Sequence, residues 1–153
     1  MTPKRIFKIG IDPGVTGALV CLEGNEISDM VDMPTIDMPS GKKQVNAAQI
    51  AKILTAWQED SIVILERVSA MPGQGVSSMF NFGMGYGIIQ GVVMAMGIPM
   101  RLVSPQVWKK RAGLLGKDKD YARTLAQQLW PGAELGRKKD IGKADALLIA
   151  KYG

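Results

Sequence analysis

Three short apolar segments, separated by turns of only a few residues, begin this sequence and restrict the folds that it can adopt. They are Ile6–Ile11, Gly17–Leu22 and Glu26–Met33. Connections this short join antiparallel strands, because parallel neighbours need a crossover of a dozen or more residues. The turns are rich in Asp, Pro, Gly and Asn, which is typical of strand ends. The beginning of the chain therefore predicts an antiparallel meander of three strands.

Helical and strand patterns alternate after this meander. Residues 34–43 read as a loop, and Asn46 is expected to cap a helix that ends at Trp57. The run Ile62–Leu65 is apolar at every position, as in a strand buried on both faces. The remaining elements are a long helix from Ser77 or Ser78 to about Met96, a strand over 99–103, a helix capped by Ser104 and helices over 118–130 and 142–152. This order predicts one α/β domain over residues 1–153, with a mixed five-stranded sheet and helices on both faces.

Two residue counts exclude several kinds of active site. The 153 residues contain no histidine and one cysteine, Cys21. These counts exclude a Ser-His-Asp triad, a histidine base and a His–Cys zinc site. A bound metal would have mostly carboxylate ligands, and such ligands favour Mg²⁺ or Mn²⁺. Residues 1–8 lack the apolar region expected of a signal peptide, and the apolar stretch Ile88–Met100 is too short to span a bilayer. We expect a cytoplasmic protein with no membrane partner.

The net charge of +5 is concentrated in the last third of the chain. Residues 1–100 contain seven basic and nine acidic residues, whereas residues 101–153 contain twelve basic and five acidic ones. This distribution is typical of a protein that binds a nucleic-acid backbone, although a solvated lysine-rich surface has the same composition. The candidate DNA-contacting residues are Lys109, Lys110, Arg111, Lys117, Lys119, Arg123, Arg137, Lys138, Lys139 and Lys143.

Four acidic residues stand where an α/β sheet binds ligands. Asp12 and Glu66 each end a predicted strand, and ligands of open α/β sheets bind beyond the carboxyl ends of the strands. Asp145 lies beside the apolar stripe of the last helix, and Asp140 immediately precedes that helix. The alternatives are a turn residue at Asp12, an ion pair at Glu66 and a helix-start residue at Asp140. Together on one edge, these acids would form an all-oxygen site for two metal ions.

Three motifs carry these acids in order along nearly the whole chain. They are residues 9–14 (IGIDPG) with 16–18 (TGA), residues 64–66 (ILE) and residues 143–147 (KADAL). The ordered set resembles the RuvC family of Holliday-junction resolvases, in the ribonuclease H-like superfamily, and most of all the compact members from phages and prophages. The resemblance implies a ribonuclease H-like fold, cleavage of four-way junctions and other branched DNA, a homodimer, and a location in a bacterial cell or phage-infected host.

The resemblance also implies roles for individual residues. Asp12 would be shared by two Mg²⁺ ions, for which Mn²⁺ could substitute, Glu66 would bind one of them, and Asp145 matches the final acid of the family. Lys109 is expected to hold the scissile phosphate. The expected reaction is two-metal hydrolysis of a DNA phosphodiester, which leaves a 5′-phosphate and a 3′-hydroxyl.

The chain departs from the family pattern at two aligned positions, and it also lacks the histidine that many relatives have near the last helix. Cellular members have an aspartate three residues before the final acid, where this chain has Gly142, so Asp140 is the candidate fourth ligand. They also have an aromatic residue that stacks at the junction centre, where this chain has Ser69. The candidates to replace that aromatic residue are Met71, Phe80 and Phe82.

The long apolar helix contains a stripe of glycines. Gly83, Gly87 and Gly91 recur every four residues, although each glycine costs about 1 kcal/mol of helix stability relative to alanine. Such a stripe indicates that another backbone comes close. The helix is therefore expected either to pack tightly on the sheet or, as the resemblance implies, to form the interface of a two-fold dimer.

Three other functions fit parts of the pattern. Asp12 and the glycines after it resemble the phosphate loop of actin, Hsp70 and sugar kinases, but that fold needs two duplicated halves. Another ribonuclease H-like nuclease, which cuts RNA–DNA hybrids or flaps, would use the same acids. A non-catalytic protein that binds branched DNA is disfavoured by the presence of Asp12, Glu66 and Asp145 together.

Overall fold

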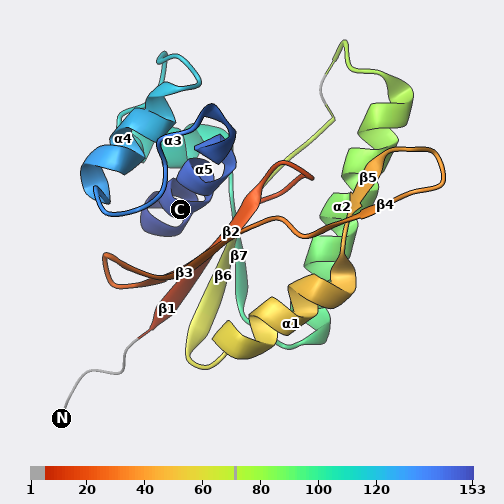
Figure 1. Cartoon of the computed structure of the whole chain (residues 1–153), viewed down its shortest axis with the longest axis horizontal. Coiled ribbons are helices and arrows are strands. Elements are labelled where there is room, and N and C mark those ends of the chain that lie inside the picture. Colours follow the sequence, from red (N-terminus) through yellow and green to blue (C-terminus); the bar gives the residue numbers. More distant parts are fainter. Residues whose placement is uncertain (1–5, 71) are drawn as a thin grey trace.

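A mixed five-stranded sheet forms the centre of the protein (Figure 1), seen in a computed structural model that describes residues 6–70 and 72–153. The strand order is β3-β2-β1-β6-β7. The first three strands pair antiparallel, whereas β6 pairs parallel with β1 and with β7. The predicted mixed sheet is thus confirmed. Its strands are β1 (Phe7–Asp12), β2 (Ala18–Glu23), β3 (Glu26–Asp32), β6 (Ser61–Glu66) and β7 (Met100–Val103).

Helices cover both faces of the sheet, as Figure 1 shows. Two lie on one face, and three lie on the other, where the 3-10 helix η1 directly precedes the last of them. None of the helices in the described part of the chain is both long enough and apolar enough to cross a membrane. The helices are α1 (Ala47–Trp57) and α2 (Val76–Ala95) on the first face, and α3 (Pro105–Ala112), α4 (Tyr121–Leu129), η1 (Lys138–Asp140) and α5 (Ile141–Tyr152) on the second.

Capping residues set the ends of two predicted helices. The Asn46 side chain accepts a hydrogen bond from the Gln49 amide, 3.2 Å away, and so begins α1. Ser104 caps α3 in the same way, with Pro105 at the first helical position, where a missing N–H costs nothing. Both caps were predicted from the sequence, and they are confirmed.

The segment predicted as a loop over residues 34–43 is instead part of a small hairpin. Its strands are β4 (Thr35–Asp37) and β5 (Lys43–Val45). The Gln44 amide nitrogen donates to the backbone oxygen of Asn81 on α2 at 3.0 Å, and the Asn81 amide nitrogen donates to the Lys43 oxygen at 2.9 Å. These bonds to a distant helix hold two strands that are too short and too polar to be recognised from local sequence.

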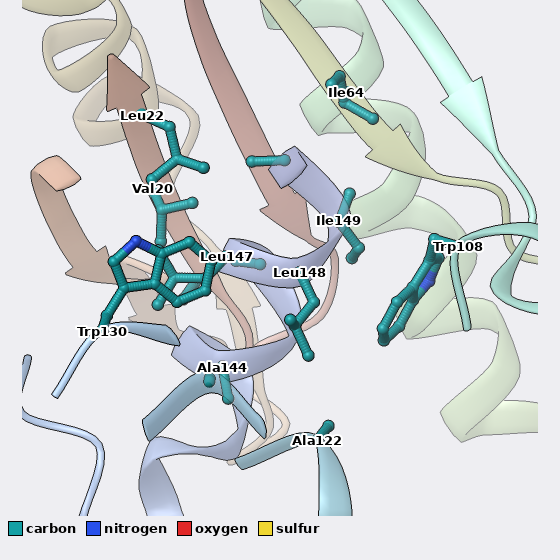
Figure 2. Close-up of a cluster of buried hydrophobic side chains, with 14 of the residues drawn as sticks. Val20, Leu22, Ile64, Trp108, Ala122, Trp130, Ala144, Leu147, Leu148 and Ile149 are labelled. Atoms are coloured by element: carbon teal, nitrogen blue, oxygen red, sulfur yellow. The ribbon is translucent and has the colours of Figure 1, made fainter. Parts of the chain in front are cut away.

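Helix α5 lies directly on β1 because β1 has a glycine at the crossing point. A Cβ atom at Gly10 would overlap the carbonyl oxygen of Ala146 and would lie 2.8 Å from the Cβ of Ala150. The α5 residues Leu147, Leu148 and Ile149 are fully buried in the core of this face, together with Trp108 and Trp130 (Figure 2). The fold therefore fixes α5 closely against the strand that carries Asp12.

Candidate active site

The two-residue period of a β-strand places Asp12 and Glu66 on the same face of the sheet. Ile9 and Ile11 pack into the core on the α1 and α2 side, so Gly10 and Asp12 face α5. In β6, Ile64 packs on the α5 side, so Glu66 faces that side too. The two acids follow the paired residues Ile11 and Leu65, on adjacent parallel strands that lie about 4.8 Å apart.

The third acid reaches this edge from α5. Asp145 lies one turn after Gly142, where a Cβ atom would overlap the carbonyl oxygen of Thr16 and lie 3.1 Å from the Cα of Gly17. The start of α5 therefore touches the turn between β1 and β2, immediately after Asp12. Asp12, Glu66 and Asp145 come from three elements, and the charge effects of Asp145 and Glu66 on Asp12 and of Glu66 on Asp145 show that they lie near one another.

The three carboxylates have raised pKa values. Burial is the largest cause for each. Burial and the nearby charge of Glu66 raise the pKa of Asp145 to about 7, and the charges of Asp145 and Glu66 add to the effect of burial in raising the pKa of Asp12. Neither Asp12 nor Asp145 forms an ion pair with a described residue. Half-buried like charges without a direct counter-ion are the arrangement that a cation stabilises.

The donor chemistry of the cluster fits Mg²⁺ or Mn²⁺, but the described side chains do not form a closed metal site. Carboxylate oxygens are the ligands that both ions prefer. Across residues 6–70 and 72–153, no three acidic or cysteine side chains lie close enough together to hold an ion as they stand. The acids do shift one another's pKa values, so they share one site. Binding a cation would require their side chains to draw together.

Glu66 has a partner that the sequence did not predict. The buried indole nitrogen of Trp108, on α3, donates a hydrogen bond of 2.6 Å to Glu66 Oε2 and lowers the pKa of Glu66, partly opposing the effect of burial. Trp108 also belongs to the core cluster in Figure 2, so the orientation of Glu66 is tied to core packing. The two residues are 42 positions apart, and no local pattern indicates that they meet.

Lys109 and Lys119 are the cations that act on the acids. Lys109 lowers the pKa of Asp12, Glu66 and Asp145, and Lys119 lowers that of Asp12 and Asp145. The ammonium of Lys109 also lies 5.5 Å from the centre of the Trp108 ring. The sequence marked Lys119 only as a DNA contact, whereas the structure places it near the candidate metal ligands.

Asp140 does not join the other three acids. Its carboxylate is 1% exposed and accepts hydrogen bonds from the Arg137 backbone N–H at 2.9 Å and the Arg137 guanidinium at 2.9 and 3.1 Å. These bonds lower the pKa of Asp140, and Lys143 lies 3.9 Å away. Asp140 is not among the charges that shift the other acids. The observed interactions of Asp140 fix the start of α5. This is the role of a helix-start residue, which the sequence left open as the alternative to a metal ligand.

The ten candidate DNA-contacting residues divide into two groups. Three are occupied within the protein: Arg123 binds Asp120 at 2.9 Å, Arg137 binds Asp140, and Lys143 is largely buried between Asp32 and Asp140. The other seven have exposed side chains and no ion pair with a described residue. This exposed group consists of Lys109, Lys110, Arg111, Lys117, Lys119, Lys138 and Lys139.

The candidates for the missing aromatic residue differ in position. Phe82 is half-buried, and its ring lies 3.3 Å from the position of a Cβ on Gly14, in the turn after Asp12. Phe80 is 70% exposed. Met71 lies outside the described residues. Phe82 therefore supports the turn that follows Asp12, whereas Phe80 is free to contact a ligand.

The glycine stripe of α2 does not pack on the sheet. Side-chain atoms added at Gly83, Gly87 and Gly91 would meet nothing within 4 Å. The glycine in close contact is Gly85, against the side chain of Gln44. Tight packing on the sheet, one of the two interpretations of the stripe, is therefore wrong. Large apolar side chains that are exposed along the helix are Val76, Phe80, Met84 and Met94.

Comparison with known sequences returns a junction-cleaving enzyme. The chain is 33% identical over 120 residues to "Holliday junction resolvase MOC1, chloroplastic" from Chlamydomonas reinhardtii. The match covers 74% of this chain and 14% of that protein, so the chain spans about a seventh of the length of its curated relative. No family model matches the sequence.

Comparison with solved structures returns the same class of protein. RuvC of Thermus thermophilus, in complex with a Holliday junction substrate, superposes with a TM-score of 0.66 at 18% identity, over 95% of this chain and 90% of that one. The yeast mitochondrial Holliday junction resolvase Ydc2 superposes with a TM-score of 0.50 at 18% identity, over 97% and 78%. The chain therefore has the RuvC-type, ribonuclease H-like fold that the sequence predicts.

Proposed function

We propose that this chain is a RuvC-family endonuclease that cleaves Holliday junctions and other branched DNA by metal-dependent hydrolysis of phosphodiesters. The observation that carries the proposal is that Asp12, Glu66 and Asp145 lie near one another at one sheet edge, half-buried and without an ion pair to any described residue. The 33% identity to a Holliday junction resolvase supports the choice of substrate. The products would be a 5′-phosphate and a 3′-hydroxyl. The protein would act in the cytoplasm of a bacterial cell or of a phage-infected host.

Asp12, Glu66 and Asp145 would hold two Mg²⁺ ions, with Mn²⁺ as a substitute. When bound, such ions activate the attacking water and neutralise charge on the leaving oxygen. The carboxylates contribute in their ionised form, and because burial raises the pKa of Asp145 to about 7, this form of Asp145 is reached as the pH rises towards 8. Trp108 holds Glu66 in one orientation through its 2.6 Å hydrogen bond. Asp140, bound by Arg137, would keep the start of α5 in place.

Lys109 and Lys119 would bind the scissile phosphate. Both act electrostatically on the acids, and neither has a direct carboxylate partner among the described residues. An ammonium placed there attracts the phosphate before cleavage and stabilises the charge that builds up on its oxygens during it. The other exposed basic residues would bind the backbone of the DNA arms, which gives affinity that depends on salt.

A cleavage assay tests the proposal directly. Labelled four-way junction, flap, RNA–DNA hybrid and plain duplex are incubated with the protein in Mg²⁺, in Mn²⁺ and in EDTA. We expect cleavage of the junction by two symmetric nicks, little cleavage of the duplex, and none in EDTA. Preferential cleavage of the hybrid or flap would favour another ribonuclease H-like activity. Tight junction binding without cleavage under any condition would favour a non-catalytic DNA-binding protein.

A dimer through α2 would place two active sites on one junction. The open stripe formed by Gly83, Gly87 and Gly91 would let two such helices approach closely, and apolar side chains exposed along the helix would be buried. A symmetric contact of this kind closes as a two-fold dimer.

The substitution Met84→Glu is expected to turn this dimer into a monomer. Met84 is 40% exposed, so a charge there is tolerated by the monomer but costly within an apolar interface. Light scattering at several protein concentrations measures the mass. The control is Leu115→Glu, which places the same charge at a 52% exposed apolar residue outside α2 and should leave the mass unchanged. A wild-type protein that stays monomeric even with junction DNA would contradict the dimer.

A further inference from the structure

A basic pocket lies along the open edge of the sheet, next to the candidate active site. β7 is the last strand in the sheet order, so its outer edge pairs with no other described strand. The pocket has a volume of about 490 Å³ and no acidic residue in its lining. We call it the β7 pocket, and its polar lining consists of Arg67, Arg101, Arg111 and Ser104.

Arg67 connects the β7 pocket to the active site. It follows Glu66 directly, and its backbone N–H donates to the Val103 oxygen at 2.7 Å, one residue beyond the pair formed by Glu66 and Val103. The Arg67 side chain is exposed, and within residues 6–70 and 72–153 it forms no ion pair. Arg67 therefore links the β7 pocket to the end of β6, one residue beyond Glu66 along the chain.

The other two arginines are held in place by the end of α5. An Arg101 nitrogen donates to the Gly153 oxygen at 3.0 Å, and an Arg111 nitrogen donates to the Tyr152 oxygen at 2.9 Å. Each guanidinium has five N–H groups, so these bonds orient the head and leave most donors available. Ser104 Oγ accepts from the Val107 amide at 3.3 Å and keeps its own proton to donate.

This set of donors matches a chain of phosphates. Arginine forks bind phosphate oxygens in pairs, and no acidic side chain in the lining competes for the three guanidinium groups, of which Arg101 also contacts the Gly153 oxygen. We propose that the β7 pocket binds backbone phosphates of the DNA strand next to the scissile one, so that one arm of the substrate leaves the active site along β7. This inference rests on the proposed function and adds a path for the DNA. The sequence did not indicate this path, because Arg67 and Arg101 are not among the ten basic residues that it identified as candidate DNA contacts.

Salt-dependent binding tests the proposal. Fluorescence anisotropy of a labelled four-way junction is measured in EDTA at several salt concentrations, with wild-type protein, Arg67→Gln, Arg101→Gln and the double variant. We expect affinity to fall about 10-fold in the double variant and the salt slope to decrease by about 0.9 for each lost phosphate contact. Lys52→Gln removes one positive charge from an exposed position on α1, on the other face of the sheet, and should change neither value.

Substrate length separates a phosphate contact from loss of structure. Junctions with one arm shortened to a few base pairs should bind the wild-type protein more weakly, and the double variant should lose little further affinity, because the contact is already absent. A double variant that behaves like Lys52→Gln would overturn the proposal, as would a pocket that binds inorganic phosphate while junction affinity stays at the wild-type value. An effect confined to Arg101→Gln would also overturn it, because Arg101 contacts the end of α5 and the loss would then be structural.

A wild-type protein that does not cleave junctions would refute the proposed function, whereas the salt slopes would still test the pocket.

Discussion

The substitution Asp145→Asn is expected to reduce junction cleavage by at least about 10³-fold and, at the same time, to raise the Tm of the metal-free protein at pH 8. The loss of activity follows because a carboxylate ligand of the catalytic metals is removed. The gain in stability follows because burial and Glu66 raise the pKa of Asp145 to about 7. At pH 8 the wild-type carboxylate is therefore ionised at a cost, and asparagine removes that cost.

The sign of the pH dependence follows from the raised pKa. A carboxyl group whose pKa is about 7 when folded and 3.8 otherwise favours the folded state at low pH, and this contribution is lost as the pH rises to 7. At about 1.36 kcal/mol per pKa unit, the loss for Asp145 is roughly 2–4 kcal/mol. Metal-free wild-type protein should thus lose Tm between pH 4.5 and 8 more steeply than Asp145→Asn does.

Thermal unfolding across this pH range, with EDTA or with Mg²⁺, measures both effects. Mg²⁺ should raise the Tm of the wild-type protein at pH 8 and have little effect on Asp145→Asn. The matched control is Asp37→Asn, which changes an exposed carboxylate paired with Lys43 and should keep cleavage and the wild-type pH profile. Full cleavage by Asp145→Asn would refute its role as a ligand. A lower Tm for this variant at pH 8 would refute the account of the buried charge.

The substitution Gly10→Ala is expected to lower the free energy of unfolding by about 2–4 kcal/mol. The added Cβ atom would overlap the Ala146 carbonyl oxygen and lie 2.9 Å from the Ala150 nitrogen, so α5 would have to move off β1. That movement would also displace Asp145 from Asp12, so cleavage by the folded fraction should fall as well.

Urea unfolding, with activity measured on the folded fraction, checks both consequences. Gly132→Ala is the matched control, because an added Cβ atom there meets nothing within 4 Å, and its stability should stay within about 0.5 kcal/mol of wild type. Equal stability of Gly10→Ala and Gly132→Ala would show that α5 does not depend on a close approach to β1.

The sequence was sufficient to predict the sheet, and to point to Asp12 and Glu66 as neighbours at its edge, because those features are local. The apolar run before Glu66 and the short turns after Asp12 and between the first strands are read within a few residues. Period-two alternation then places Asp12 and Glu66 on one face. Asp145 follows because the last helix has to cover that face.

The features that sequence reasoning missed all depend on contacts between distant or competing groups. Trp108 meets Glu66 across 42 positions, and the β4–β5 hairpin is held by a helix that begins 31 residues after β5 ends. The assignment of Asp140 as a ligand overlooked Arg137, three residues before it, which captures the carboxylate within the same turn. Arg137 is visible in the sequence near Asp140, but residue type alone does not distinguish an aspartate that pairs with an arginine from one that binds a metal.

The contact between Gly142 and the turn after Asp12 has a consequence for how such a site changes over generations. The position where the family resemblance places a fourth acid has no room for any side chain, because the Thr16 carbonyl oxygen occupies the space. Restoring an aspartate there would first require α5 to withdraw, and that withdrawal would separate Asp145 from Asp12. In a chain with this contact, a fourth acid at position 142 would need a second change that moves α5 or the Thr16 turn, so one substitution alone could not introduce it.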